Sequence, residues 1–431
     1  MRQLGPGEAS RRREQSAGEP LPLRTVEPGV RLFPTEQPFM MPYLASANLY
    51  GNTCLQEGAL IASDPLSEGA QAVKTALSEI GFNYGLWQSY DFVGITGARD
   101  GEQSTFNYYS LDFYGTLAVF ATDEMGGTAG WLTMGASVGQ GLGYDAAVDG
   151  PRQSMGALGF PMGVDYGQQI FPTQLAWQQS FLDGQLVVTA GFLNQEFYLD
   201  LNTYANNQYS QLLNYEFITP STLPWSFQAL GLVVQWQPVE WFYAMWSSTA
   251  NNTQAGQSPF SQLSFDNWSN TFEFGWVADD VLGLGPGIYR ALPFVATVDG
   301  SMGAGIMFNV EQRLTKELPL AAFARGGFGN PNVTRLGGTQ ASFAGGIAFT
   351  GPTEATFFKG QQAYLAAGFY WLEAAQQVGP RTDEYGIELT YVLQVTPTLT
   401  LQPDLQVILN PVDNLNHDTS VALTLQLNMA W

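Results

Sequence analysis

Polar side chains recur at every second position near the C-terminal end of the chain, in a pattern suited to reversible hydrogen bonding. Between residues 384 and 406, carboxylates and amides alternate with Tyr, Ile, Leu and Val. Successive side chains of a strand point to opposite faces, so these polar groups share one face. Groups of this kind can exchange hydrogen bonds with a polar solute and then release it. The set comprises Glu384, Glu388, Gln402, Asp404 and Gln406.

Charged side chains of both signs accompany this set. By strand parity, Glu311 and Arg313 point to one side of an earlier strand. Arg381 lies just before the strand that begins near residue 384, and Arg325 lies in the strand-like AAFARGGF. Opposite charges on neighbouring walls would create a transverse field that orients water and polar solutes. The alternative for each of these residues is a solvated side chain with no special role.

The chain is poor in the residues that most enzymes and metal sites use. His417 is the only histidine and Cys54 the only cysteine among 431 residues. His417, Asp418 and Ser420 lie too close together in one loop to converge easily as a catalytic triad. The formal net charge of −22 argues against a nucleic-acid partner, because phosphate binding needs basic patches. We therefore expect no enzymatic activity, no metal or other cofactor, and no nucleic-acid partner.

The elements that would position the polar groups are strands, as the last residues show most clearly. From Val421 to Trp431 the odd positions are Val, Leu, Leu, Leu, Met and Trp, and the even positions are Ala, Thr, Gln, Asn and Ala. Such a strand suits the wall of a membrane barrel, apolar toward lipid and polar toward a lumen. If Trp431 lies at the periplasmic side, Thr396-Pro397 forms a periplasmic turn and the loop around His417 is extracellular.

The composition favours the same architecture for most of the chain. Charged residues make up 13% of the sequence and aromatic residues 13%, with 48 glycines, a mix that suits many strands with tight turns. Asp183-Gly184 is a strong hairpin signal. The longest uncharged stretch, from Trp241, is too polar for a spanning helix. Residues 82–431 therefore predict an all-β fold, a transmembrane antiparallel β-barrel of about 16 strands with a short N-terminal helix before it.

Two segments precede the predicted barrel. Residues 1–62 are rich in Pro, Gly and Glu and are predicted to be irregular or disordered. They contain no apolar region typical of a secretory signal, so we expect either a truncated start or a leader that has been replaced. Residues 63–81 predict an amphipathic helix.

The helix prediction rests on its ends and on one apolar face. Asp64 is a suitable N-cap and Pro65 suits the first helical position. Val73, Leu77 and Ile80 fall on one face at spacings of four and three. Such a helix could simply pack at the edge of the barrel, or it could form a plug or cap at the barrel mouth.

Aromatic residues are expected at the two membrane interfaces. Trp236, Trp241 and Trp246 recur at spacings of five, and their parity prevents all three from sharing one face of a strand. Girdle aromatics flanking a Gln237-Pro238 turn are the favoured interpretation, and a ladder for stacking sugar rings is the alternative. The expected interface residues are Trp431, Trp236, Trp241, Tyr385 and Tyr391.

Several of these stretches resemble the carbohydrate-selective porin family of the OprB type. The resemblance rests on WQQSFLDGQLVVTAGFLNQEFY from Trp177, on EYGIELTYVLQVTPTLTLQPDLQVILNP from Glu384, and on AVKTALSEIGFNYGLW near the N-terminal helix. It extends from about Ala70 to the end of the chain and is weaker in the middle. The resemblance implies a 16-stranded outer-membrane barrel through which sugars diffuse, with a narrow zone lined by charged residues, arginine prominent among them.

Three interpretations of function remain open from the sequence. The first is a porin for mono- or oligosaccharides in the outer membrane of a Gram-negative bacterium. The second is a general or cation-leaning porin for small polar solutes, which the charge of −22 favours. The third is a soluble all-β carbohydrate-binding protein. The partners expected for a porin are sugars or other small polar solutes, outer-membrane lipid, the barrel assembly machinery, and two further copies of the chain in a homotrimer.

Overall fold

The structure, a computed structural model, describes residues 59–61, 64–122, 128–143, 150–159, 161, 169–182, 184–224, 228–251, 260, 263–334, 338–351, 363–375 and 381–430. Asp183, Trp431 and nearly all of residues 1–62 lie outside these ranges, so the expectations for them stay predictions. Within these ranges, no helix has both the length and the apolar character needed to cross a bilayer.

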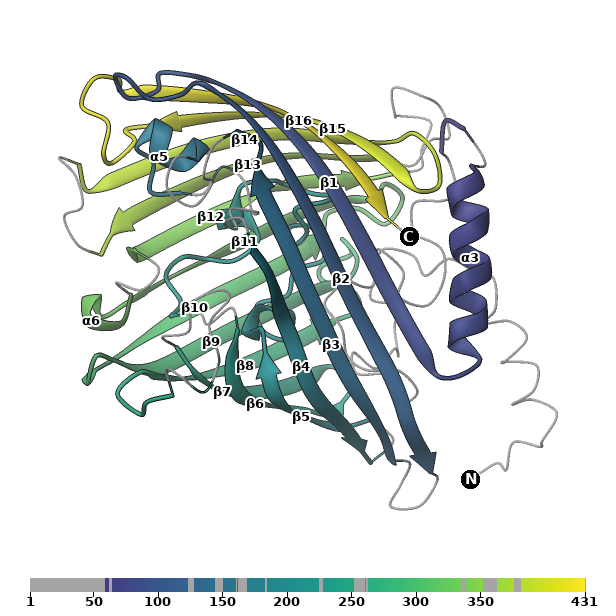
Figure 1. Ribbon diagram of the computed structural model, residues 1–431. Coiled ribbons are helices and arrows are strands. Elements are labelled where there is room, and N and C mark those ends of the chain that lie inside the picture. Colours follow the sequence, from purple (N-terminus) through teal and green to yellow (C-terminus); the bar gives the residue numbers. More distant parts are fainter. Residues whose placement is uncertain are drawn as a thin grey trace.

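Sixteen antiparallel strands close into one barrel in chain order, with β1 paired to β16 (Figure 1). The predicted all-β barrel of about 16 strands is confirmed. The strands are β1 Phe82–Thr96, β2 Thr105–Thr122, β3 Thr128–Gly141, β4 Gln169–Phe181, β5 Leu186–Leu193, β6 Ala229–Val239, β7 Phe242–Ala250, β8 Trp268–Ala278, β9 Gly287–Val298, β10 Ser301–Arg313, β11 Leu320–Gly329, β12 Thr339–Thr350, β13 Ala363–Ala374, β14 Asp383–Gln394, β15 Leu399–Leu409 and β16 Thr419–Ala430.

The alternation within each strand sorts side chains between the lumen and the outer surface. On β16, Thr424, Gln426 and Asn428 are buried inside the barrel, whereas Leu423 is 61% exposed on the outside. Polar residues are therefore buried and apolar residues are exposed, which is the reverse of a soluble protein and suits a lipid-facing outer surface.

The C-terminal strands pair in the register that their alternation predicts. Thr390 of β14 lies opposite Asp404 of β15, which lies opposite Thr424 of β16. The Thr396-Pro397 turn lies at the same end of the barrel as Ala430, and the loop around His417 lies at the other end. We call these the terminal end and the loop end.

Helix α3 (Pro65–Ser78) stands beside the terminal end of the barrel (Figure 1). Its N-cap, Asp64, accepts a hydrogen bond from the main-chain N–H of Ser67 at 2.7 Å, as predicted. On the predicted apolar face, Val73 is 50% and Ile80 70% exposed. Lys74 faces the barrel instead, with its ammonium 5.5 Å from the ring centre of Tyr84. The left-handed Gly81 (φ +80°) leads directly into β1 and so fixes the rotation of the helix.

The aromatic residues of β6 and β7 depart from expectation in one respect. Strand β6 continues through Gln237 and Pro238 to Val239, so the turn lies at residues 240–241 rather than at Gln237-Pro238. A register shift between Trp236 and Val239 resets the parity. Trp236 and Trp246 share the outer face, and Trp241 is exposed in the turn. Tyr385 and Tyr391 lie on the outer face of β14 near its two ends.

Candidate pore interior

The long connection between β5 and β6 folds into the barrel. Nearly all of residues 194–224, here called the inner loop, are buried. Their only charged residues are Glu196, Asp200 and Glu216, and none is basic. Asn, Gln, Tyr and Leu dominate the rest. These side chains are uncharged, so burying them against a polar wall leaves no cation without a partner. The inner loop contains two short 3-10 helices, η1 Gln195–Phe197 and η2 Tyr215–Phe217.

Four asparagines shape the inner loop locally. Each one accepts, through its side-chain oxygen, a hydrogen bond from the main-chain N–H two residues later, at 2.8 to 3.1 Å. This is the Asx turn, in which the side chain mimics a backbone turn. The inner loop is therefore a chain of local turns and satisfies many of its own donors. The four residues are Asn194, Asn202, Asn207 and Asn214.

Carboxylates of the wall hold main-chain N–H groups of the segments inside the barrel. Glu388 of β14 accepts from Leu213 at 2.5 Å and from Asn214 at 3.0 Å. Glu384 accepts from Leu158 at 2.6 Å and from Gly159 at 2.8 Å, just after the short helix α5 (Pro151–Met155). Charge-assisted bonds of this kind are roughly twice as strong as neutral ones.

Wall amides hold main-chain carbonyl oxygens in the same way. Each donates from its nitrogen to a carbonyl of a segment inside the barrel, so the amide oxygen points elsewhere. The reverse orientation would place two oxygens in contact. The pairs are Gln402 with Gln211, Gln406 with Pro161, and Asn428 with Tyr209.

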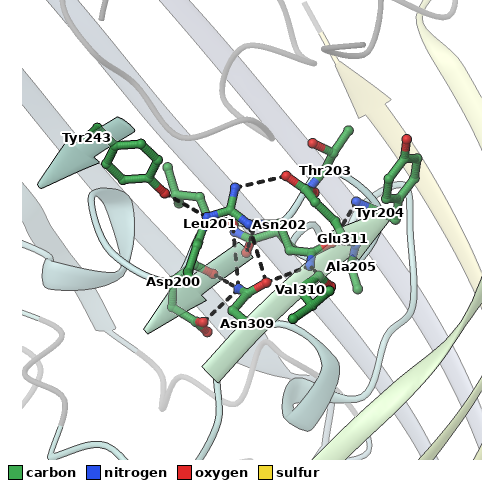
Figure 2. Close-up of polar contacts among 12 residues, drawn as sticks. Asp200, Leu201, Asn202, Thr203, Tyr204, Ala205, Tyr243, Asn309, Val310 and Glu311 are labelled. Atoms are coloured by element: carbon green, nitrogen blue, oxygen red, sulfur yellow. Dashed lines mark hydrogen bonds and ion pairs between the residues drawn. The ribbon is translucent and has the colours of Figure 1, made fainter. Parts of the chain in front are cut away.

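A network of ion pairs holds the inner loop to β8, β9 and β10 (Figure 2). Arg290 donates to Glu311 at 2.8 Å and to the Tyr243 hydroxyl at 2.8 Å, and its Nε lies 3.6 Å from Glu273. Glu311 in turn accepts from the main-chain N–H of Thr203 at 2.5 Å. The arginine is therefore already matched by two carboxylates.

Asp200 of the inner loop extends this network to β11. It lies 3.2 Å from the guanidinium of Arg325 and accepts from the Asn309 side chain at 2.7 Å. Its main-chain N–H donates to Glu273 at 2.7 Å. Arg325 is fully buried and also donates to the carbonyls of Ala205 and Ile218. Figure 2 shows the inner-loop residues Asp200 to Ala205 crossing over Asn309 and Glu311 of β10.

One arrangement of three residues occurs twice in the wall. A tyrosine lies across from a glycine on the next strand, and its hydroxyl donates to a glutamate two residues before that glycine. A Cβ on either glycine would lie 2.0 Å from the tyrosine ring, so only glycine lets the ring lie there. Each glutamate holds a main-chain N–H inside the barrel. The sets are Tyr243, Gly275 and Glu273, and Tyr370, Gly386 and Glu384.

The residues predicted to line a pore are thus found in three settings. Six of them face the interior and bond to the inner loop or to residues 158–161: Glu311, Arg325, Glu384, Glu388, Gln402 and Gln406. Asp404 faces the interior and accepts from Gln406 of its own strand at 2.9 Å. Arg381 pairs with Asp418 at the loop end, and Arg313 donates to the Leu318 carbonyl at the terminal end. Their role toward a solute stays a prediction.

Sequence reasoning missed several interior charges. Glu273 and Arg290 are single charges in otherwise uncharged strands, in TFEFGW and IYRAL, and strand parity alone could have found them. Asp91 of β1 and Asp112 of β2 are buried in the same way. The inner loop has no apolar periodicity, and its lack of basic residues was the available signal that it is buried.

Comparisons with known proteins agree with this architecture. Residues 293–430 match the family described as carbohydrate-selective porin, OprB family. This segment resembles the OprB family. The high-pH structure of Pseudomonas putida OprB aligns with a TM-score of 0.64 and 15% sequence identity, over 87% of this chain and 99% of that one. A mutant of the Rh. blastica porin aligns with a TM-score of 0.52 and 8% identity, over 81% and 100%. No curated protein matches the sequence.

The solved structures support the fold, and the family segment supports the class. At these identities, the structural likeness concerns the barrel alone. Together, the closed 16-stranded barrel and the segment that matches the OprB family model indicate an outer-membrane porin, a channel rather than an enzyme.

Proposed function

We propose that this OprB-type porin lets carbohydrates diffuse passively across the outer membrane. The observation that carries the proposal is the lumen wall of β14, β15 and β16, which lies within the OprB segment and presents carboxylate, amide and hydroxyl groups inward. These groups can accept hydrogen bonds from sugar hydroxyls, and each exchange is weak enough for release. Glu384, Glu388, Gln402, Asp404 and Gln406 are proposed as part of this solute-facing wall.

Charged groups of both signs are proposed to shape the field across the lumen. Arg325 and Glu311 contribute from the β10–β11 side. Arg313 and Arg381, near the two ends of the barrel, are proposed to act on solutes as they enter or leave.

The expected partners follow from the surface and the chain end. The exposed Leu, Ile, Val and aromatic side chains of the outer face suit contact with lipid. Trp236, Trp241, Trp431, Tyr385 and Tyr391 are proposed to lie at the membrane interfaces. We also propose that the barrel assembly machinery reads the terminal strand, and that the chain can form a homotrimer.

Liposome swelling tests the proposed function directly. Purified protein would be reconstituted, and swelling rates would be compared for neutral mono- and disaccharides, amino acids of matched size, and salts. Faster swelling with sugars than with matched solutes is the expected result. A folded, inserted protein that gives no swelling with any solute would overturn the open-channel function.

A second candidate is a general or cation-leaning diffusion porin. The observation in its favour is the formal net charge of −22, together with buried carboxylates on β1, β2 and β15. Equal swelling rates for sugars, amino acids and salts of similar size would support this candidate over the first.

A further inference from the structure

The inner loop is held unequally by two sides of the wall. On β8 to β11 it is held by carboxylates and arginines, through Glu273, Glu311 and Arg325. On β15 and β16, between the carboxylates Glu388 of β14 and Asp112 of β2 that also hold it, the inner loop is held by neutral amides, through Gln402 and Asn428. Charge-assisted bonds are roughly twice as strong as neutral ones. The contact with β15 and β16 is therefore the weaker of the two.

The weaker side also carries a row of oxygen atoms without hydrogen-bond partners. Each belongs to a side chain that is at most 3% exposed and that strand alternation directs inward. The amide members use their nitrogens on the inner loop, which leaves their oxygens unused. We call these atoms the acceptor strip. Its members are Asp91 Oδ1, Ser110 Oγ, Gln402 Oε1, Asp404 Oδ2, Thr424 Oγ1 and Asn428 Oδ1.

Strand register makes the acceptor strip continuous. Asp404 lies opposite Thr424, and two residues toward the terminal end Gln402 lies opposite Gln426, which lies opposite Asp91. A further two residues along, Asn428 and Ser110 both lie opposite Ser89 of β1. With about 3.4 Å per residue, the strip runs roughly 14 Å along the wall.

The neighbours explain only part of the acceptor strip. Ser89 donates to the other oxygen of Asp91 at 2.9 Å, and the side chains of Gln426 and Glu388 also hydrogen-bond to Asp91 and Asp404 respectively. The oxygens of the four uncharged members have no donor in hydrogen-bond geometry. Apolar residues also occur in this wall: Val93 lies opposite Thr424, and Ala422 lies in the next row toward the loop end, opposite Gln406. Apolar residues could therefore have filled the strip positions too, and buried oxygens without donors are unfavourable.

We propose that the inner loop parts from the wall along the acceptor strip, and that solute passes there. This inference rests on the proposed porin function and names its route and selectivity. Sugar hydroxyls donate to the strip oxygens as the solute passes, one row after another. Asp91 and Asp404 repel anions, while Arg290 and Arg325 are already matched by carboxylates and offer anions no compensation. Neutral sugars and amino sugars therefore pass more readily than sugar acids or phosphorylated sugars.

Cysteine accessibility tests the route. In a Cys54→Ser background, Thr424→Cys places a thiol on the acceptor strip and Thr271→Cys places one on β8, and both threonines are buried inside the barrel. A cationic methanethiosulfonate would be added to the reconstituted channel while current and labelling are measured. Labelling at residue 424 at least tenfold faster than at residue 271 is expected. Equal rates, or faster labelling at residue 271, would overturn the proposed route.

Charge substitution tests the selectivity. Swelling rates for glucosamine, glucose and gluconate would be compared between the unmodified protein and the double variant Asp91→Asn, Asp404→Asn. A unit charge about 6 Å from the solute changes passage by about threefold even in water, so the ratio of glucosamine to gluconate rates should fall by at least that factor. Glu317→Gln, in an exposed turn, removes one charge away from the lumen and serves as the control.

These experiments separate the two proposals. Heat-modifiable migration on gels would confirm that each variant is a folded barrel. If the unmodified protein passes sugars and the double variant keeps its ratio, the acceptor strip is wrong and the porin function stands. If the unmodified protein passes no solute at all, both proposals fail.

Discussion

Arg290 of β9 donates to Glu311 of β10 at 2.8 Å, and both side chains are buried inside the barrel beneath the inner loop. A buried pair of this kind is costly to break, because removing one member leaves a charge without compensation. Glu311 also accepts the main-chain N–H of Thr203. The pair therefore links the wall to the position of the inner loop.

Replacing Arg290 with methionine should destabilise the protein strongly. Glu311 and Glu273 would lose their shared cation, and breaking a buried pair costs about 3–5 kcal/mol. Urea unfolding in a fixed detergent would measure the loss, and hydrogen exchange at Asp200 and Thr203 would show the inner loop loosening. Arg381→Met is the control, because its partner Asp418 is 86% exposed and such surface pairs contribute about 0–1 kcal/mol. Equal losses in the two variants would contradict this account.

Gly275→Ala should disturb the same network from the neighbouring strand. The new Cβ would lie 2.0 Å from the Tyr243 ring, so the ring must move away from Glu273 and Arg290. Overpacking of this kind costs about 1–3 kcal/mol. Gly94→Ala is a matched control in β1, since nothing lies within 4 Å of its Cβ position. The thermal unfolding midpoint of Gly275→Ala should be clearly lower than that of Gly94→Ala. Similar midpoints would argue against a role for Gly275 in making room for the Tyr243 ring.

The inner loop should be held less tightly as pH rises. Burial raises the pKa of Glu216 to about 7 from 4.5, with Ser221 as its hydrogen-bond partner and Glu384 and Arg152 also acting on it. Because the raised pKa means that Glu216 binds its proton more tightly when the inner loop is docked, Glu216 stabilises the docked loop fully below pH 4.5. This stabilisation is lost as pH rises through 7.

Bilayer recordings between pH 4 and 8 would measure this effect. Conductance should increase with pH, because the equilibrium constant for docking of the inner loop falls by up to about tenfold per pH unit. Glu216→Gln should flatten the dependence, because the amide cannot titrate. A curve that the substitution leaves unchanged would assign the pH dependence to other groups.

Helix α3 should depend on its N-cap. Asp64 accepts from the Ser67 main chain and from the Thr398 hydroxyl at 3.1 Å, so it joins the helix to the β14–β15 turn. Asp64→Ala should cost about 1 kcal/mol and fray the first turn without opening the barrel. Limited proteolysis would detect the fraying. Ser67→Ala keeps the main-chain N–H and should resist cleavage like the unmodified protein.

The barrel could be predicted from sequence because alternation is a local signal. Each of β14, β15 and β16 shows its lumen face within about ten residues, so Glu384, Glu388 and Gln402 were correctly placed inside. Their bonding partners could not be predicted. Glu388 holds Leu213, which lies 175 residues away, and Glu384 holds Leu158, which lies 226 residues away. No periodic pattern links such segments, because neither Leu158 nor Leu213 lies in a helix or strand.

The errors have local physical causes. The rotation of α3 was not predicted, because apolar spacing does not reveal the orientation that Gly81 and β1 impose. The β6–β7 turn was misplaced because Pro238 was taken as a turn residue, although it is accommodated in the strand, within the register shift between Trp236 and Val239.

The wall binds the inner loop in part through main-chain atoms: the N–H groups of Asp200, Thr203 and Leu213 and the carbonyls of Tyr209 and Gln211. Main-chain groups are the same for almost every amino acid, so substitutions at these loop positions leave their anchoring bonds intact. The side chains of Thr203 and Leu213 can therefore vary while the barrel stays constant, whereas the Asp200 carboxylate and the Tyr209 hydroxyl bond to the wall themselves. For protein engineering, the barrel is a reusable frame into which loops of new sequence and the same backbone path can be placed.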